Sequence, residues 1–80
     1  MVDILASLVH DIWCRWMEYV FSKSIPNEDG SYTIPEELAK RWLRQMITYY
    51  NDLPEEERYS DIKIANEILA VIEEEKHSWG

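Results

Sequence analysis

The chain has 80 residues, of which 46% are hydrophobic and 12% aromatic, and its formal net charge is −8. This composition is too apolar for a disordered acidic tail, and the length allows one small domain, spanning residues 1–80, with one core. The acidic balance makes the chain a poor partner for nucleic acid or for an anionic membrane, unless it imitates a nucleic acid.

The N-terminus is apolar but carries acidic residues from Asp3 onward and has no basic segment before them. It therefore predicts neither a signal peptide nor a membrane span. Cys14 is the only cysteine, so no internal disulfide can form, and a reducing cytoplasm is the expected compartment.

The first predicted helix covers residues 3–21, where apolar side chains recur at three- and four-residue spacing. They cover about half of the helix circumference, which is more than one partner helix can bury. We place Trp13 and Trp16 at the edge of this arc, although aromatic residues at helical spacing more commonly belong to a core. The width of the arc predicts that the excess is covered by two helices, by a ligand or by a second subunit, and we expect a homo-oligomer.

Residues 22–33 contain an Asn-Glu-Asp-Gly sequence that predicts a tight turn with Gly30 at positive φ. Thr33 and Glu36 have the spacing of a capping box, with a proline between them. The second predicted helix therefore runs over residues 34–51.

A change of charge marks this second helix. Residues 38–51 contain no Asp or Glu but include Lys40, Arg41 and Arg44, so a basic island lies in an acidic chain. A local excess of charge attracts a ligand of opposite sign, and arginine forks suit phosphate. We expect the two arginines to lack a carboxylate partner in their own helix.

In a continuous helix, Arg41, Gln45 and Thr48 would form one row beside Trp42 and Tyr49. The apolar members of this segment are core residues by default. A base stacked on one of the aromatic rings is the functional alternative.

The third predicted helix covers residues 61–76, begins at a Ser60 cap and is preceded by a short helical turn at residues 54–58. Glutamates crowd both the turn and the end of the helix. Together the segments predict an all-α fold, a compact bundle of three main helices at about 3–21, 34–51 and 61–76.

Two stretches resemble the RyR repeat domain of ryanodine receptors, which also occurs as small free-standing proteins of phages and bacteria. Residues 9–13 (VHDIW) are similar to the family's helix with His and Trp three residues apart. Residues 50–61 (YNDLPEEERYSD) are similar to its tyrosine, leucine-proline, acid-rich turn and capping aspartate. The family's Gly-Trp-x-Tyr-Gly stretch is absent, and residues 34–48 look more like small phage proteins with an Arg-Trp-x-Arg-Gln-Met helix.

The resemblance implies an α-helical module that recognises nucleotide-like ligands, in the host cytoplasm if a phage encodes it. The expected ligand-binding residues come from the basic island, from its aromatic neighbours and from the two similar stretches. They are His10, Trp13, Trp16, Arg41, Trp42, Arg44, Gln45, Thr48, Tyr49, Tyr50 and Asp61.

Catalytic and metal-binding patterns are weak. His10 and Cys14 lie four residues apart and could bind zinc with His77 or Asp11, but a zinc site needs four ligands and this spacing supplies two. No metal and no cofactor is expected. The sequence has no Gly-rich phosphate loop, nucleophile elbow or HExxH motif, so we expect a binding protein and not an enzyme.

Two functions follow from these patterns. The first is a sponge for a nucleotide-derived immune signal, of the cyclic nucleotide or ADP-ribose class, which would inhibit host antiviral defence. The second is an acidic inhibitor without a small-molecule ligand, which presents its glutamate clusters to a basic protein surface as a nucleic-acid mimic.

Overall fold

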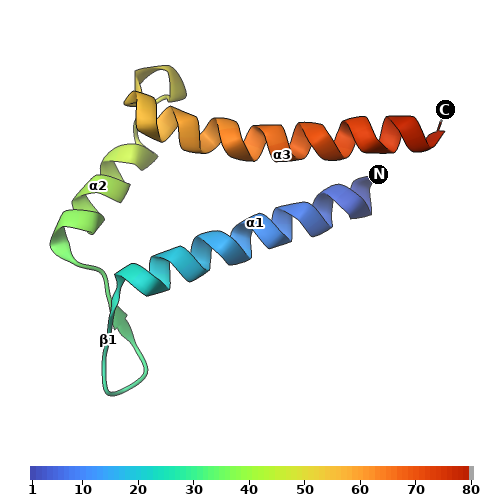
Figure 1. Ribbon diagram of the computed structural model, residues 1–80. Coiled ribbons are helices and arrows are strands. Elements are labelled where there is room, and N and C mark those ends of the chain that lie inside the picture. The colour runs from blue at the N-terminus through green and yellow to red at the C-terminus, as the bar shows by residue number, and fades with distance from the viewer. Residues whose placement is uncertain (80) are drawn as a thin grey trace. The chain divides into compact units, whose positions relative to one another are not determined.

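The computed structural model describes residues 1–79 and the side chains of residues 1–76. Three helices, α1 (Val2–Lys23), α2 (Glu36–Met46) and α3 (Glu55–Trp79), carry most of the chain (Figure 1). With the short 3-10 turn η1 (Tyr50–Asp52), helical residues make up 76% of it. The predicted all-α class with three main helices is therefore confirmed.

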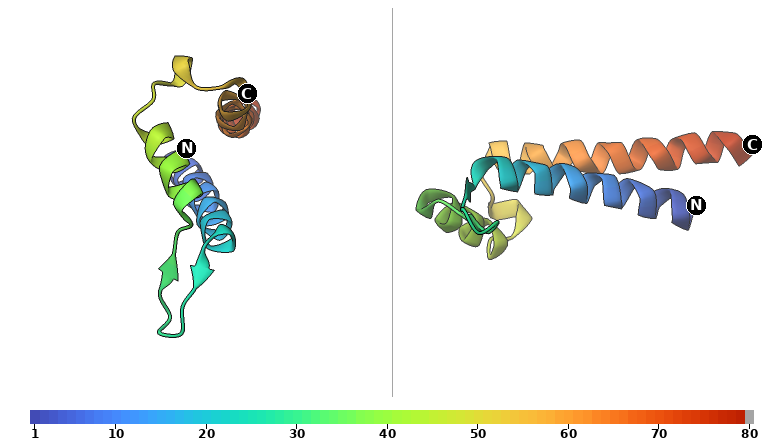
Figure 2. Two further views of the ribbon diagram at one scale, coloured as in Figure 1. Left: turned by 90° about the vertical axis from the view of Figure 1, so that its left-hand side faces the viewer. Right: turned by 90° about the horizontal axis from the view of Figure 1, so that it is seen from below.

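The chain divides into two compact units. Unit 1 combines Met1–Trp13 with Pro54–Gly80, and unit 2 is Cys14–Leu53. Within unit 1, the first part of α1 lies beside α3 and runs in the opposite direction (Figures 1 and 2). Unit 2 contains the rest of α1, a small hairpin, α2 and η1.

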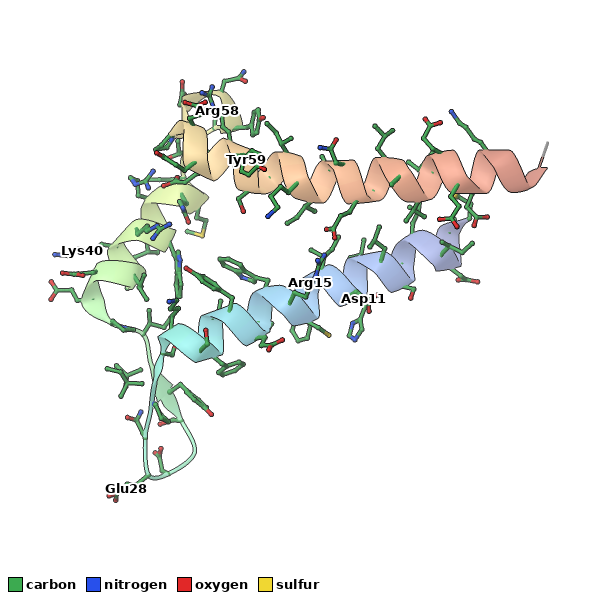
Figure 3. All side chains as sticks on the ribbon, in the orientation of Figure 1. Asp11, Arg15, Glu28, Lys40, Arg58 and Tyr59 are labelled. Carbon is green, nitrogen blue, oxygen red and sulfur yellow. The ribbon has the colours of Figure 1, made fainter. Side chains whose placement is uncertain are left out.

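The segment predicted as a loop contains a two-stranded antiparallel hairpin, formed by β1 (Ile25–Pro26) and β2 (Tyr32–Thr33) (Figure 2). Gly30 has a φ of 89°, as the turn sequence predicts. The Asn27 amide nitrogen donates to Ser31 Oγ at 3.0 Å and to Thr33 Oγ1 at 3.1 Å, so one side chain joins both arms of the turn. Glu28 lies at the exposed tip (Figure 3).

The Asp29 side chain stabilises the turn through hydrogen bonds with Ser31. Its carboxylate accepts hydrogen bonds from the Ser31 hydroxyl at 2.6 Å and from the Ser31 backbone N–H at 3.0 Å. These two bonds, the hydroxyl first, lower the pKa of Asp29 from its ordinary value, because they stabilise the charged form.

The predicted capping box at the start of α2 is wrong. The N-cap residue is Pro35, and no side chain caps the helix. Thr33 pairs instead with Ile25 in the hairpin, and its hydroxyl accepts the hydrogen bond from Asn27. The prediction failed because Thr33 belongs to β2 and α2 begins only at Glu36, so Thr33 does not occupy the N-cap position.

Helix α2 also ends earlier than predicted, at Met46 instead of Asn51. The Thr48 hydroxyl donates to the Arg44 carbonyl at 2.6 Å, and the Ile47 and Thr48 N–H groups turn back to the Arg44 and Gln45 carbonyls. β-Branched Ile47 and Thr48 are poor helix formers, and a threonine hydroxyl competes for backbone carbonyls. Tyr50 therefore begins the separate turn η1.

Helix α3 joins two segments that the sequence suggested as separate. It begins at Glu55, directly after Pro54, with three glutamates in its first turn, where the helix dipole favours acids. Ser60 and Asp61 consequently lie inside the helix, and the predicted caps at these positions are wrong.

No side chain among residues 1–76 is buried, and the apolar residues are half-buried or exposed. On α1, Trp13 is 55% exposed and Trp16 is 48% exposed, so neither belongs to a closed core. Within residues 1–79, no helix is both long enough and apolar enough to cross a membrane.

Candidate ligand site on helix α2

Three aromatic rings of unit 2 form a cluster between α1 and α2. The Trp42 ring contacts Trp16 edge to face, with ring centroids 6.0 Å apart, and lies 6.3 Å from the Tyr19 ring. Trp16 and Tyr19 are 5.4 Å apart, and Lys23 Nζ lies 5.9 Å from the Tyr19 centroid. Trp42 stays half-buried, so its ring is held by two neighbours and is still partly accessible.

Tyr19 belongs to this cluster although it was not among the predicted site residues. Tyr19 follows Trp16 by three residues, and this spacing places two side chains on the same face of a helix. The signal was therefore present in the α1 pattern.

The basic residues of α2 point in different directions around the helix. At about 100° per residue, Arg41 lies about 100° from Trp42, whereas Lys40 and Arg44 lie about 160° from it, on the far side. Gln45 lies about 60° from Trp42 on the same side as Arg41. Trp42, Gln45 and Arg41 thus form one continuous surface, which we call the α2 face, and Arg44 lies about 60° beyond Arg41, at the border farthest from Trp42.

The charged groups of α2 differ in their partners. Lys40 Nζ contacts Glu36 Oε1 at 2.8 Å in an exposed i, i+4 pair, and Lys40 projects away from the helix (Figure 3). The expectation that α2 offers the arginines no carboxylate is wrong for Arg41, because Glu37 precedes it by four residues. Among the described side chains, however, Arg41 forms no ion pair, and its guanidinium is exposed.

The early end of α2 removes three predicted residues from the α2 face. The Thr48 hydroxyl is used at the helix end, and Tyr49 lies beyond it with 83% of its surface exposed. Tyr50 is 47% exposed in η1. The predicted row of Arg41, Gln45 and Thr48 is therefore not formed, because it required a helix through Asn51.

The remaining predicted residues belong to unit 1. His10 and Trp13 stack on one another, with ring centroids 5.9 Å apart and an interplanar angle of 19°. Asp61 is exposed in the interior of α3. The predicted site is thus divided between two units, and the structure brings Trp16 and Trp42 together in unit 2.

His10 and Cys14, the two residues with zinc-ligand spacing, lie four residues apart on α1. Among the described residues, no three His, Cys, Asp or Glu side chains are grouped so that they could hold a metal ion. The side chain of His77, a further ligand considered with them, lies outside the described side chains.

Comparison of the chain with models of known protein families, with curated proteins and with solved structures finds no match.

Proposed function

We propose that this chain is a binding protein that sequesters a small anionic ligand of the nucleotide class on the α2 face. The observation that carries the proposal is an exposed Arg41 without an ion pair among the described side chains, next to the half-buried Trp42 ring. The chain as a whole has a net charge of −8, so the basic segment is where an anion is attracted.

Each residue of the face has a distinct role. The accessible part of the Trp42 ring stacks a base, since every base has a π-face and stacking is tolerant of its identity. Gln45 supplies an amide that can donate and accept hydrogen bonds, and Arg41 holds a phosphate with its planar fork. Trp16 and Tyr19 keep the indole in place, which reduces the entropy lost on binding.

The resemblance to RyR repeat domains supports the ligand class. In a phage, such a protein would remove a cyclic nucleotide or ADP-ribose signal on which host antiviral defence depends. The function requires binding alone, and the α2 face has the groups for binding.

The proposal is tested by a thermal-shift screen of the purified chain with cyclic dinucleotides, ADP-ribose derivatives and plain nucleotides. A ligand that binds only the folded state stabilises it by about 2.7 kcal/mol at a concentration one hundred times its Kd. We expect stabilisation by at least one of these classes and none by inorganic phosphate at the same concentration.

Arginine variants then locate the site. A charge-assisted hydrogen bond is worth about 1.5–3 kcal/mol, so Arg41→Ala should weaken binding roughly tenfold to a hundredfold without lowering the melting temperature of the free protein. Arg44→Ala should weaken it less, because Arg44 is on the far side of α2. Lys40→Ala is the matched control, since it also removes one positive charge from α2 but leaves the α2 face intact. Equal affinity of the wild type and Arg41→Ala for every nucleotide tested would contradict the proposal.

A second candidate is an inhibitor that binds another protein. The observation that favours it is the position of both glutamate clusters, residues 55–57 and 73–75, on the single helix α3. Small molecules alone would not stabilise such a protein, whereas its protein target would.

A further inference from the structure

Helix α3 has apolar residues on two opposite sides. One side is half-buried and consists of Ile64, Ile68, Val71 and Ile72. The other side is exposed, with Tyr59 at 61%, Ile62 at 42% and Leu69 at 52% of their surfaces accessible. At about 100° per residue, these two sides are separated by roughly half a turn.

The exposed side has the spacing of a helix-pairing seam. Tyr59, Ile62, Asn66 and Leu69 follow one another at steps of three, four and three residues, the repeat with which one helix packs along another. Asn66 is exposed and occupies the middle of this row. A single polar residue in such a seam selects the partner and its register.

Glutamates close the row at both ends. Glu55 precedes Tyr59 by four residues and Glu73 follows Leu69 by four, so both continue the same row and both are exposed. They are about five helical turns apart, or roughly 27 Å along the axis. We call the row from Glu55 to Glu73 the α3 stripe.

The charges decide what can cover the α3 stripe. A second copy packed in parallel would place Glu55 against Glu55, and an antiparallel copy would place Glu55 against Glu73. Like charges facing each other across an interface are costly, and the net charge of −8 adds to the repulsion. A partner with a basic residue at each end has neither penalty.

We propose that the α3 stripe is a docking surface for an amphipathic helix of another protein, one with an apolar seam and a Lys or Arg at each end. The apolar side chains of the partner cover Tyr59, Ile62 and Leu69. Amphipathic helices are commonly bound in this way, through apolar residues at positions i, i+3, i+4 and i+7. The two basic residues pair with Glu55 and Glu73, and a polar residue faces Asn66. This surface needs no ligand on α2, so it can fail while the nucleotide proposal stands.

The test uses three labelled synthetic peptides with the full chain. The first has leucines at three- and four-residue spacing, a central asparagine and a lysine at each end of the seam. The second has the same composition with the leucine positions scrambled, and the third replaces the terminal lysines by glutamates. Fluorescence anisotropy should show micromolar binding of the first peptide, and binding at least tenfold weaker for the other two.

Charge reversal in the protein separates a defined surface from general attraction. Glu55→Lys/Glu73→Lys should weaken binding of the lysine peptide at least tenfold and create binding of the glutamate peptide. Glu56→Lys/Glu74→Lys is the matched control, because it changes the same charge at the same two helix ends about 100° away around α3. The control should bind the lysine peptide within about threefold of wild type, because charges beside the α3 stripe affect mainly the rate at which the peptide associates.

Leu69→Asp tests the apolar part, and circular dichroism checks that the variant keeps its helix content. We expect loss of peptide binding with the helix signal retained. Equal binding of the scrambled peptide, equal effects of the two charge reversals, or no binding at about 100 μM peptide would each overturn the proposal. So would a wild-type dimer in sedimentation that Leu69→Asp dissociates, because the stripe would then be an interface between two copies.

Discussion

Helices α2 and α3 differ in where their exposed apolar residues lie. In α2, Trp42 is directed toward the aromatic residues of α1, and the exposed Leu43 and Met46 lie within about 100° of it around the helix. In α3, the half-buried side around Ile68 is matched by an exposed apolar side that includes Leu69. The exposed apolar side of α3 lies about half a turn from the half-buried side, which is why the proposed docking surface is on α3 and not on α2.

The two helices also differ in the sign of their charged residues. Helix α2 has Glu36 and Glu37 in its first turn, but its later charged residues are all basic, and a local basic excess in an acidic chain favours an anion. Helix α3 has glutamates in its first turn and again near its end, which suits a basic partner. The two helices therefore offer surfaces for two different chemistries, and substitutions on each can separate their contributions.

The largest effect is expected for Trp42→Ala, which removes the ring that joins α2 to α1. A fully buried aromatic residue typically costs about 3–5 kcal/mol on truncation, and we expect about 2–3 kcal/mol because Trp42 is only half-buried. Urea denaturation followed by circular dichroism measures this change. Tyr49→Ala is the control, and a residue that is 83% exposed should change stability by less than about 0.5 kcal/mol.

The next effect compares the two apolar sides of α3. Ile68→Ala should destabilise the chain by about 1–2 kcal/mol, at or below the lower limit for buried aliphatic residues, because Ile68 is half-buried. Leu69→Ala, one position along, should cost less than about 0.5 kcal/mol because half of its surface is already exposed. If the two variants have equal free energies of unfolding, the distinction between a covered side and a free side of α3 is wrong.

The hairpin gives a reference region that depends on neither helix face. An added Cβ at Gly30 would meet nothing within 4 Å, so Gly30→Ala changes only the cost of its φ of 89°. A left-handed conformation costs an L-residue roughly 1–2 kcal/mol. In the same urea experiment we expect the free energy of unfolding to fall by about 1 kcal/mol. Gly30→Asn should lose less, since asparagine tolerates this region better. An unchanged midpoint for Gly30→Ala would show that the hairpin unfolds separately from the helices.

The sequence was sufficient for the helix class because period and charge are local properties. Apolar residues of α1 and α3 repeat at helical spacing, and Gly30 follows the turn-forming residues Asn27 and Asp29. The end of α2 was missed although its causes, Ile47 and Thr48, are local. The start of α2 was missed because Thr33 pairs with Ile25 in the hairpin and does not cap the helix. No pattern within four residues contains that information.

The aromatic cluster between α1 and α2 could be predicted only in part. Trp16 and Trp42, both expected as ligand-binding residues, are in contact, and Tyr19 could have been added to the cluster from spacing alone. Thr48 was misplaced because its hydroxyl ends α2 by binding the Arg44 carbonyl. The orientation of Arg44 could have been deduced from the sequence. Once the segment is known to be a helix, the position of Arg44 relative to Trp42 follows from about 100° per residue.

The smallest expected effect is a pH dependence confined to the hairpin. Hydrogen bonds from Ser31 lower the pKa of Asp29 in the folded chain, so the carboxylate is bound more favourably than in the unfolded chain. This stabilisation is fully present above the ordinary carboxyl pKa and is lost as the pH falls through the lowered folded value. NMR titration should therefore show Asp29 with a pKa below the ordinary value of an aspartate, and Ser31→Ala should return the Asp29 value toward its ordinary range. Because Asp29 is fully exposed, the accompanying change in stability should be small beside that of Trp42→Ala, and it should disappear in Asp29→Asn, which has no charge to titrate. If Ser31→Ala leaves the pKa of Asp29 unchanged, the Ser31 hydroxyl is not the cause of the shift, and this explanation of the hairpin's pH dependence is wrong.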